Sequence, residues 1–193
     1  MMTLSRAACP ALLALTILVS GCSSNQPVRY AGIESASQLT SNTGDNAEHI
    51  PFHYAPQVDW SKYHSIIIDP VTIYQGADNQ FGEMELSDRE HLASYMQQKF
   101  AEELRPRFRE VSAPSPDALR LKLTLTGADT TPQVVGTVTK FDLAGGPYNI
   151  VQSIRGGKGM FSGSVNYAVE IYDASTNKLM QAYVAEQYPN AMN

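Results

Sequence analysis

The sequence predicts an α+β domain, with a mainly antiparallel sheet and one helix packed on one face. Three patterns carry this prediction: a β-branched run at 64–73, a helix-periodic segment at 87–104, and strict alternation of apolar and polar residues in two later segments. The order strand–helix–strand, followed by a β-hairpin, favours α+β over an alternating α/β fold, because consecutive strands close the sequence.

The first strand is expected at His64–Ile73, which is rich in isoleucine and valine and lacks alternation. Such a run is typical of a central strand buried on both faces. Pro70 cannot donate to a strand ladder, so it is expected to end this strand or to mark a bulge.

The helix is predicted from a capping-box pattern, in which Ser87 is the N-cap and Glu90 is the third helical residue. Pro106 is expected to end it, and Glu110–Val111 would open a second short strand. Apolar residues at helical spacing predict one core-facing stripe: Leu92, Tyr95, Met96, Phe100 and Leu104.

Two alternating segments predict half-buried strands. Leucines at every second position of Leu119–Leu125 would face the core, with Arg, Lys and Thr on the opposite face. Phe161–Ile171 alternates in the same way and, through a turn at Asp173–Asn177, would return along Leu179–Glu186 as a hairpin.

The chain opens with the pattern of a lipoprotein signal peptide at 1–21. Arg6 precedes an apolar run, Ala7–Val19, that is shorter than the roughly 20 residues of a spanning helix. The run ends in Leu-Val-Ser-Gly-Cys, which predicts cleavage between Gly21 and Cys22 and lipidation of Cys22. An ordinary signal peptide cut elsewhere, with Cys22 a free thiol, is the alternative.

Residues 22–57 are expected to form a lipidated, flexible tether, and residues 58–193 a single periplasmic domain. The tether is rich in Ser, Asn, Thr and Pro, which bury little apolar surface. Within it, Tyr30–Ile33 and Leu39 are able to pack as a short piece on the domain surface. By resemblance to Gram-negative lipoproteins, Ser23 after the lipidated cysteine favours the outer membrane.

Composition narrows the function classes. The formal net charge of −5 argues against nucleic-acid binding and against electrostatic docking on anionic lipid. The chain has two cysteines; Cys9 would leave with the leader and Cys22 would carry lipid, so no disulfide is expected.

Candidate chemical sites are weak. His49 and His53 have helical metal-ligand spacing, but Pro51 lies between them. The glycines of Arg155–Gly159 lack the Ser or Thr of a phosphate-binding loop. Asp69, at the end of the first strand, is either a ligand-facing carboxylate or a strand terminator. We therefore predict no catalytic residue, metal or cofactor.

Tyrosines give the best hypothesis for a binding surface. Tyrosine anchors many interfaces and also lines polysaccharide-binding surfaces. The alternative is that these tyrosines have no binding role, because tyrosine is common in β-strands for structural reasons. The candidates concentrate in the last third of the chain: Tyr148, Tyr167, Tyr172 and Tyr183.

Several segments resemble bacterial lipoproteins with the domain of unknown function numbered 3313. The most distinctive are Asp69-Pro-Val71 and a Glu-x-x-Asp-x-x-Thr element at 170–176. This family has no established activity, so the resemblance implies no catalytic residues. Its members continue into a C-terminal helix that this sequence is expected to lack. The other matching segments are Tyr30–Ile33, Val58–Tyr63, Leu119–Thr126 and Gly163–Glu170.

Together these observations predict an outer-membrane-anchored, periplasm-facing module that interacts with or scaffolds an envelope protein and is not an enzyme. One alternative is a binding module for a small envelope ligand such as a glycan or lipid, with a pocket beside the sheet. A hydrolase with an unrecognised site is a third reading.

Overall fold

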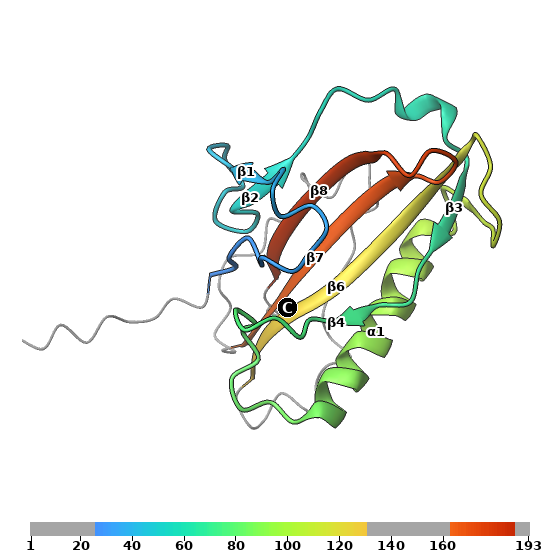
Figure 1. Cartoon of the computed structure of the whole chain (residues 1–193). Coiled ribbons are helices and arrows are strands. Elements are labelled where there is room, and N and C mark those ends of the chain that lie inside the picture. Colours follow the sequence, from blue (N-terminus) through green and yellow to red (C-terminus); the bar gives the residue numbers. More distant parts are fainter. Residues whose placement is uncertain (1–25, 131–162, 188–193) are drawn as a thin grey trace, which may run out of the picture.

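The computed structural model describes residues 26–130 and 163–187, which form one sheet and one long helix (Figure 1). The sheet order is β1-β2-β8-β7-β6-β3-β5, and β4 pairs with β6 beyond the end of β3. Within the described residues no helix is long and apolar enough to cross a membrane. The strands are β1 (Thr40–Ser41), β2 (Phe52–Tyr54), β3 (Ser65–Ile68), β4 (Thr72–Ile73), β5 (Arg109–Glu110), β6 (Ala118–Thr130), β7 (Gly163–Asp173) and β8 (Leu179–Gln187).

The α+β prediction is confirmed, with a mixed sheet in place of a purely antiparallel one. Strands β6, β7, β8, β2 and β1 are antiparallel neighbours. Strands β3 and β4 run parallel to β6, and β5 runs parallel to β3. The parallel part follows from the connectivity, because a helix carries the chain back between β4 and β5, and parallel neighbours need such a crossover.

The predicted first strand is split in two. β3 and β4 both pair with β6, and the intervening Asp69-Pro-Val71 interrupts the ladder where Pro70 lacks an N–H. Ile66 and Ile67 are buried, as expected for a strand covered on both faces. On its other side, among the residues that the structure describes, β3 pairs with the two-residue β5.

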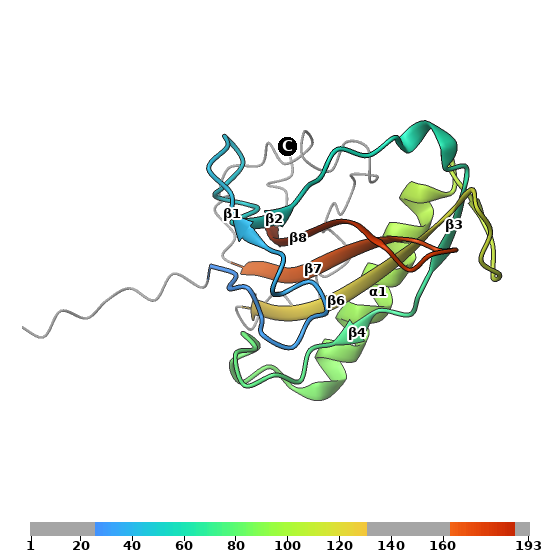
Figure 2. The ribbon, with the colours of Figure 1, turned by 45° about the horizontal axis from the view of Figure 1, so that its top comes forward.

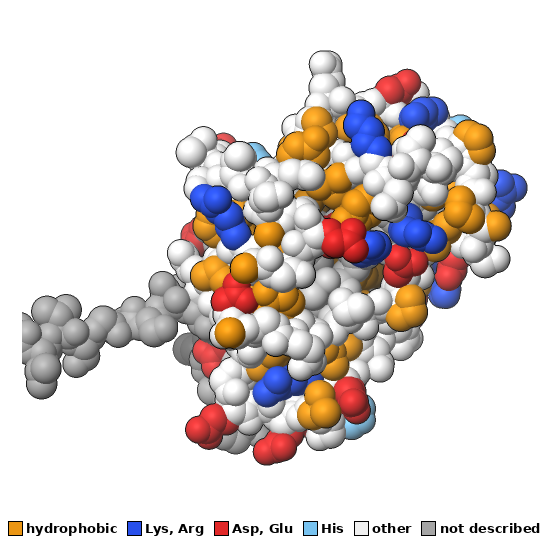
Figure 3. Space-filling model, in the orientation of Figure 1, with side chains coloured by type: hydrophobic (Ala, Val, Ile, Leu, Met, Phe, Trp, Pro, Cys, Tyr) orange, Lys and Arg blue, Asp and Glu red, His pale blue; other side chains and the backbone are white. Residues whose placement is uncertain are grey.

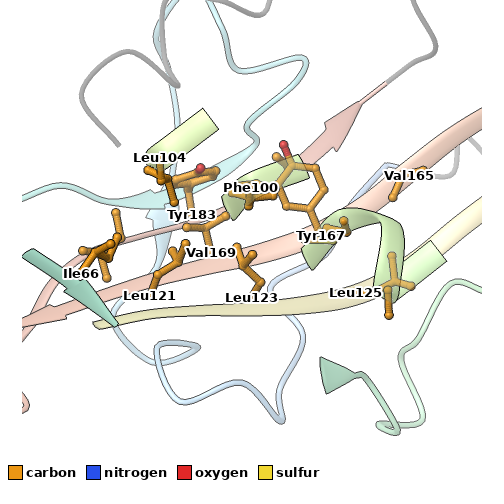
Figure 4. Close-up of a cluster of buried hydrophobic side chains, with 14 of the residues drawn as sticks. Ile66, Phe100, Leu104, Leu121, Leu123, Leu125, Val165, Tyr167, Val169 and Tyr183 are labelled. Carbon is orange, nitrogen blue, oxygen red and sulfur yellow. The ribbon is translucent and has the colours of Figure 1, made fainter. Parts of the chain in front are cut away.

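The helix α1 (Leu86–Leu104) covers one face of the sheet. It begins before the predicted capping box: Glu85 is the N-cap and makes no side-chain cap bond, so Ser87 lies in the first turn. The end before Pro106 is as predicted. Leu121, Leu123 and Leu125 point from β6 toward Phe100 and the rest of the helix's buried stripe (Figure 4), so this layer forms the main core.

The opposite face is covered by the N-terminal segment: the expected packing of Tyr30–Ile33 and Leu39 is confirmed, and the described part of 22–57 is docked on the domain instead of forming a flexible tether. Tyr30, Ile33 and Leu39 are at most 7% exposed and pack on small residues of β7 and β8, including Ala168 and Ala182. Farther along, β2 adds to the edge of β8. Figures 1 and 2 show this segment in front of the sheet and α1 behind it.

This N-terminal cover explains why the polar face of the hairpin, which the sequence predicts to be exposed to solvent, is buried. Ser164, Asn166 and Glu170 are each at most 4% exposed. The backbone N–H of Ser35 donates to the Glu170 carboxylate at 2.6 Å, so a polar position of β7 binds the cover directly. Tyr30 adopts a left-handed backbone (φ 49°), which costs about 1 kcal/mol for a bulky residue. The buried ring holds that conformation.

Asp173 organises the predicted turn between β7 and β8. Its carboxylate accepts hydrogen bonds from the Tyr63 hydroxyl at 2.8 Å and the Ser175 hydroxyl at 2.7 Å, and the Thr176 N–H donates at 3.0 Å. Lys62 lies 3.7 Å away. Burial raises the pKa of Asp173, but the hydrogen bonds outweigh burial and leave the pKa well below its ordinary value.

The Leu123→Asp substitution is expected to unfold the domain. Leu123 is 1% exposed in the core beneath α1, and an unpaired charge there should cost about 4 kcal/mol or more. Leu123→Met keeps the volume and should lose under about 1.5 kcal/mol. Chemical denaturation followed by circular dichroism measures both; normal stability of Leu123→Asp would show that this face of β6 is assigned wrongly.

Replacing Asp173 by Asn should lower the free energy of unfolding by about 1–3 kcal/mol, since buried donors lose a charged acceptor. The lowered pKa means that this stabilisation is complete above the unfolded-state value, 3.8, and is lost as the pH falls below it. When the pH is lowered from about 5 to below 3.8, the free energy of unfolding should therefore fall less for Asp173→Asn than for the wild type.

The exposed Asp45, changed to Asn, is the matched control and should behave as wild type. Identical acid unfolding of Asp173→Asn and wild type would contradict the role given to the turn carboxylate.

Candidate functional site

The strongest candidate site is a hollow of about 680 Å³ on the face that the N-terminal segment covers only in part. We call it the sheet hollow. Its walls are Gly32–Glu34, the stretch Asp69–Gly76 that contains β4, and the outward side chains of β6 and β7. Figure 3 shows acidic and basic side chains gathered near the centre of this face. The volume lies within the range of small-ligand sites.

One wall of the sheet hollow is a charged group centred on Glu34. Lys122 of β6 donates to its carboxylate at 2.7 Å, and the Tyr172 hydroxyl donates at 3.0 Å. The ammonium also lies 5.0 Å from the centroid of the Tyr172 ring. The hydrogen bond from Lys122 lowers the pKa of Glu34, with burial opposing it, so this group is a carboxylate at neutral pH.

The floor of the sheet hollow contains the other charged side chains, which are paired, and two threonine hydroxyls. Asp69 lies 3.6 Å from the Arg120 guanidinium, and Glu170 stands opposite Lys122 in the β6–β7 register. The hydroxyls of Thr72 and Thr124 are 3.1 Å apart. Each carboxylate of the hollow therefore already has a partner, while the threonine hydroxyls, bonded to each other and to the Leu123 carbonyl, keep further capacity to accept hydrogen bonds from a neutral, hydroxyl-bearing molecule.

A tyrosine–aspartate pair fixes the outer wall. The Tyr74 hydroxyl accepts from the Gly32 N–H at 2.8 Å and donates to Asp78 at 2.7 Å, while Asp78 accepts from the Ala31 N–H at 2.9 Å. The hydrogen bond from Tyr74 lowers the pKa of Asp78, and burial raises that of Tyr74. A Cβ at Gly76 would overlap the Tyr74 hydroxyl, so any larger residue there would displace the Tyr74 ring from its hydrogen bonds.

The tyrosine surface predicted from the sequence is not formed by the described residues. Tyr167, Tyr172 and Tyr183 are 3%, 4% and 2% exposed, because both faces of the hairpin are covered. The Tyr167 hydroxyl donates to the Gln187 side chain at 3.2 Å, and the Tyr172 hydroxyl donates to the Glu34 carboxylate. Their role is in the core and in the hollow's wall. Tyr148 lies outside the described residues.

The other candidate residues from the sequence also differ in where the structure places them. Asp69 does line a concave site, as its ligand-facing reading required. His53 lies in β2, paired with Tyr183, and in the described ranges no three His, Cys, Asp or Glu residues are placed to hold a metal. Gly21, Cys22 and the 155–159 segment lie outside the described residues, so lipidation stays a prediction.

Sequence reasoning missed Glu34, Lys122 and Glu170. Lys122 and Glu170 sit at polar positions of two alternating strands, and pairing those strands places them on one face. Glu34 carried no such signal, because its position depends on how the N-terminal segment docks.

Comparison with known proteins gives a family and distant structural likenesses. Two PelC dodecamer structures from Paraburkholderia phytofirmans, the second of them a single-residue variant, are 10% and 8% identical, cover 73% of this chain and 81% and 80% of theirs, with TM-scores of 0.34 and 0.35. A DUF4136 family protein from Bacteroides thetaiotaomicron is 10% identical over 68% of this chain and 78% of that chain, with a TM-score of 0.31.

Likenesses of this size carry no argument about fold or function. None of the curated proteins matches the chain. A family model described as a protein of unknown function, DUF3313, matches residues 29–193, which includes the N-terminal cover as well as the sheet and α1. The chain therefore belongs to the DUF3313 family.

Proposed function

We propose that this protein is a lipid-anchored domain of the bacterial cell envelope that acts by binding and positioning, without catalysis. The observation that carries the proposal is the apolar leader ending in Leu18-Val-Ser-Gly-Cys22. Small residues before a cysteine at the end of such a run form the pattern of a lipoprotein cleavage site. The favoured membrane is the outer one, with the domain in the periplasm and an envelope protein as its partner.

The described structure supports a short attachment. Gln26 already belongs to the folded part, since its carbonyl accepts from the Gln80 side chain at 2.8 Å. Only three residues separate Cys22 from Gln26. A module held this closely meets partners that are themselves at the membrane, where shared anchoring raises the effective concentration.

The non-catalytic part of the proposal is supported by the sheet hollow. Its three carboxylates, Glu34, Asp69 and Glu170, are engaged by a lysine, an arginine and a backbone N–H. A general acid or base needs a proton-exchanging group poised toward the substrate. The partners of these three carboxylates keep them engaged within the protein, which favours a binding role over acid–base catalysis.

A second candidate function is binding of a small, neutral, hydroxyl-rich molecule such as a glycan fragment. The sheet hollow favours it, through its volume of about 680 Å³ and the exposed hydroxyls of Thr72 and Thr124. A glycan would exchange hydrogen bonds with these groups without bringing charge.

Replacing Cys22 by Ser is expected to abolish palmitate labelling and to move the protein from the membrane to the soluble fraction. Stable membrane binding requires more than one acyl chain, and the modified cysteine would carry them. Cys9→Ser is the matched control: Cys9 lies in the leader and its loss should change neither readout. Unchanged fractionation of Cys22→Ser would refute the lipid anchor.

For the second candidate, the N-acetylglucosamine disaccharide is the probe, and its binding is measured by calorimetry. Thr124→Leu removes a hydroxyl from the hollow and should weaken binding about tenfold, near the worth of one lost hydrogen bond. The exposed Thr43, changed to Leu, should leave the affinity unchanged. Equal affinity of both variants would place the sugar elsewhere, and no binding by wild type would remove this candidate.

A further inference from the structure

We infer that one end of the sheet faces the membrane, so that the domain stands on the lipid surface in a preferred orientation. We call this the anchor end: it comprises Gln26, Gln80 and the Thr130–Gly163 pair of β6 and β7. The inference rests on the proposed lipid at Cys22 and adds the surface that meets the bilayer.

Gln80 fixes the first described residue to this end. Its backbone N–H donates to the Thr126 carbonyl at 2.9 Å, and its own carbonyl accepts from Ala128 at 3.1 Å, so it lies against the last part of β6. Its side chain accepts from Asn166 of β7 at 3.0 Å and donates to the Gln26 carbonyl. The exit point of the N-terminus is thus tied to two central strands at once. Figures 1 and 2 both show it beside the start of β7.

The spacer is short compared with the domain. From Cys22 to Gln26 the extended chain reaches about 14 Å. From Gly127, which pairs with Gln80, back to Ala118 at the start of β6, the strand runs about 30 Å. The end that holds Ala118 and the β7–β8 turn, the far end, therefore cannot replace the anchor end at the membrane surface.

The described side chains near the anchor end are consistent with attachment through the lipid alone, without attraction between protein charges and the lipid headgroups. Among the described residues the exposed large apolar side chains are Val28, two residues after Gln26, and Leu86, which opens α1 after the loop that contains Gln80. The same loop carries Asp78 and Glu83, and the exposed Arg29 follows Val28, so the described charges near this end are mixed in sign and give anionic lipid no net attraction. The preferred orientation is therefore expected in zwitterionic bilayers and should resist added salt.

The test uses two exposed loop alanines as a matched pair, Ala77 at the anchor end and Ala113 at the far end. Once Cys22 is lipidated and Cys9 has left with the leader, Ala77→Cys and Ala113→Cys each carry a single thiol for a fluorophore. The labelled, lipidated proteins are placed in phosphatidylcholine vesicles that contain a headgroup spin label, and quenching of the fluorophore is measured.

Quenching at position 77 should exceed that at position 113 by about twofold or more, because the spacer's reach is less than half of the separation between the two ends. Equal quenching, or stronger quenching at 113, would overturn the orientation. Inserting a Gly-Ser segment of about 20 residues between Asn25 and Gln26 should abolish the difference. A difference that survives the insertion would overturn the short spacer as its cause.

Flotation of the same vesicles separates the two ideas. Wild type that fails to float with the lipid would refute the anchor itself. Protein that floats but shows no difference between the two labels refutes only the orientation.

Discussion

The three long strands β6, β7 and β8 need two covers, and this constraint determines the rest of the structure. On one face the leucines of β6 require the apolar stripe of α1. On the other, small residues such as Ala168 and Ala182 leave room for a thin layer of chain, and Tyr30, Ile33 and Leu39 fill it. A buried tyrosine or leucine gains about 2 kcal/mol from leaving water, so a few such residues suffice to hold an otherwise polar segment in place.

The two covers explain how much the sequence could predict. Leu119–Leu125 and α1 were readable because their apolar periodicity lies within one local stretch. The N-terminal cover was predicted only in part, as a short packed piece at Tyr30–Ile33 and Leu39, because its apolar residues are sparse and many of its contacts are distant in the sequence: Ser35 reaches Glu170 across 135 positions. The hairpin tyrosines were misassigned for the same reason, since their burial depends on a layer that no local pattern announces.

The family elements quoted from the sequence have structural explanations. In the Glu-x-x-Asp-x-x-Thr element, Glu170 binds the cover, while Asp173 accepts from Thr176 and closes the turn. Tyr30–Ile33 forms the docked bend, and Asp69-Pro-Val71 is the break between β3 and β4 at the floor of the sheet hollow. These motifs serve architecture, and the hollow arises where the architecture leaves the second face incompletely covered.

The docking of β2 on β8 also sets the order in which the fold can be completed. Phe52 pairs with Val184, so β2 can dock only after β8, which lies much later in the chain, has been made. Contacts between such distant parts of a chain form slowly, since a long loop must close first. Until β8 has been synthesised, β2 has no strand edge to join, and the side of the sheet beside β8 stays open to water.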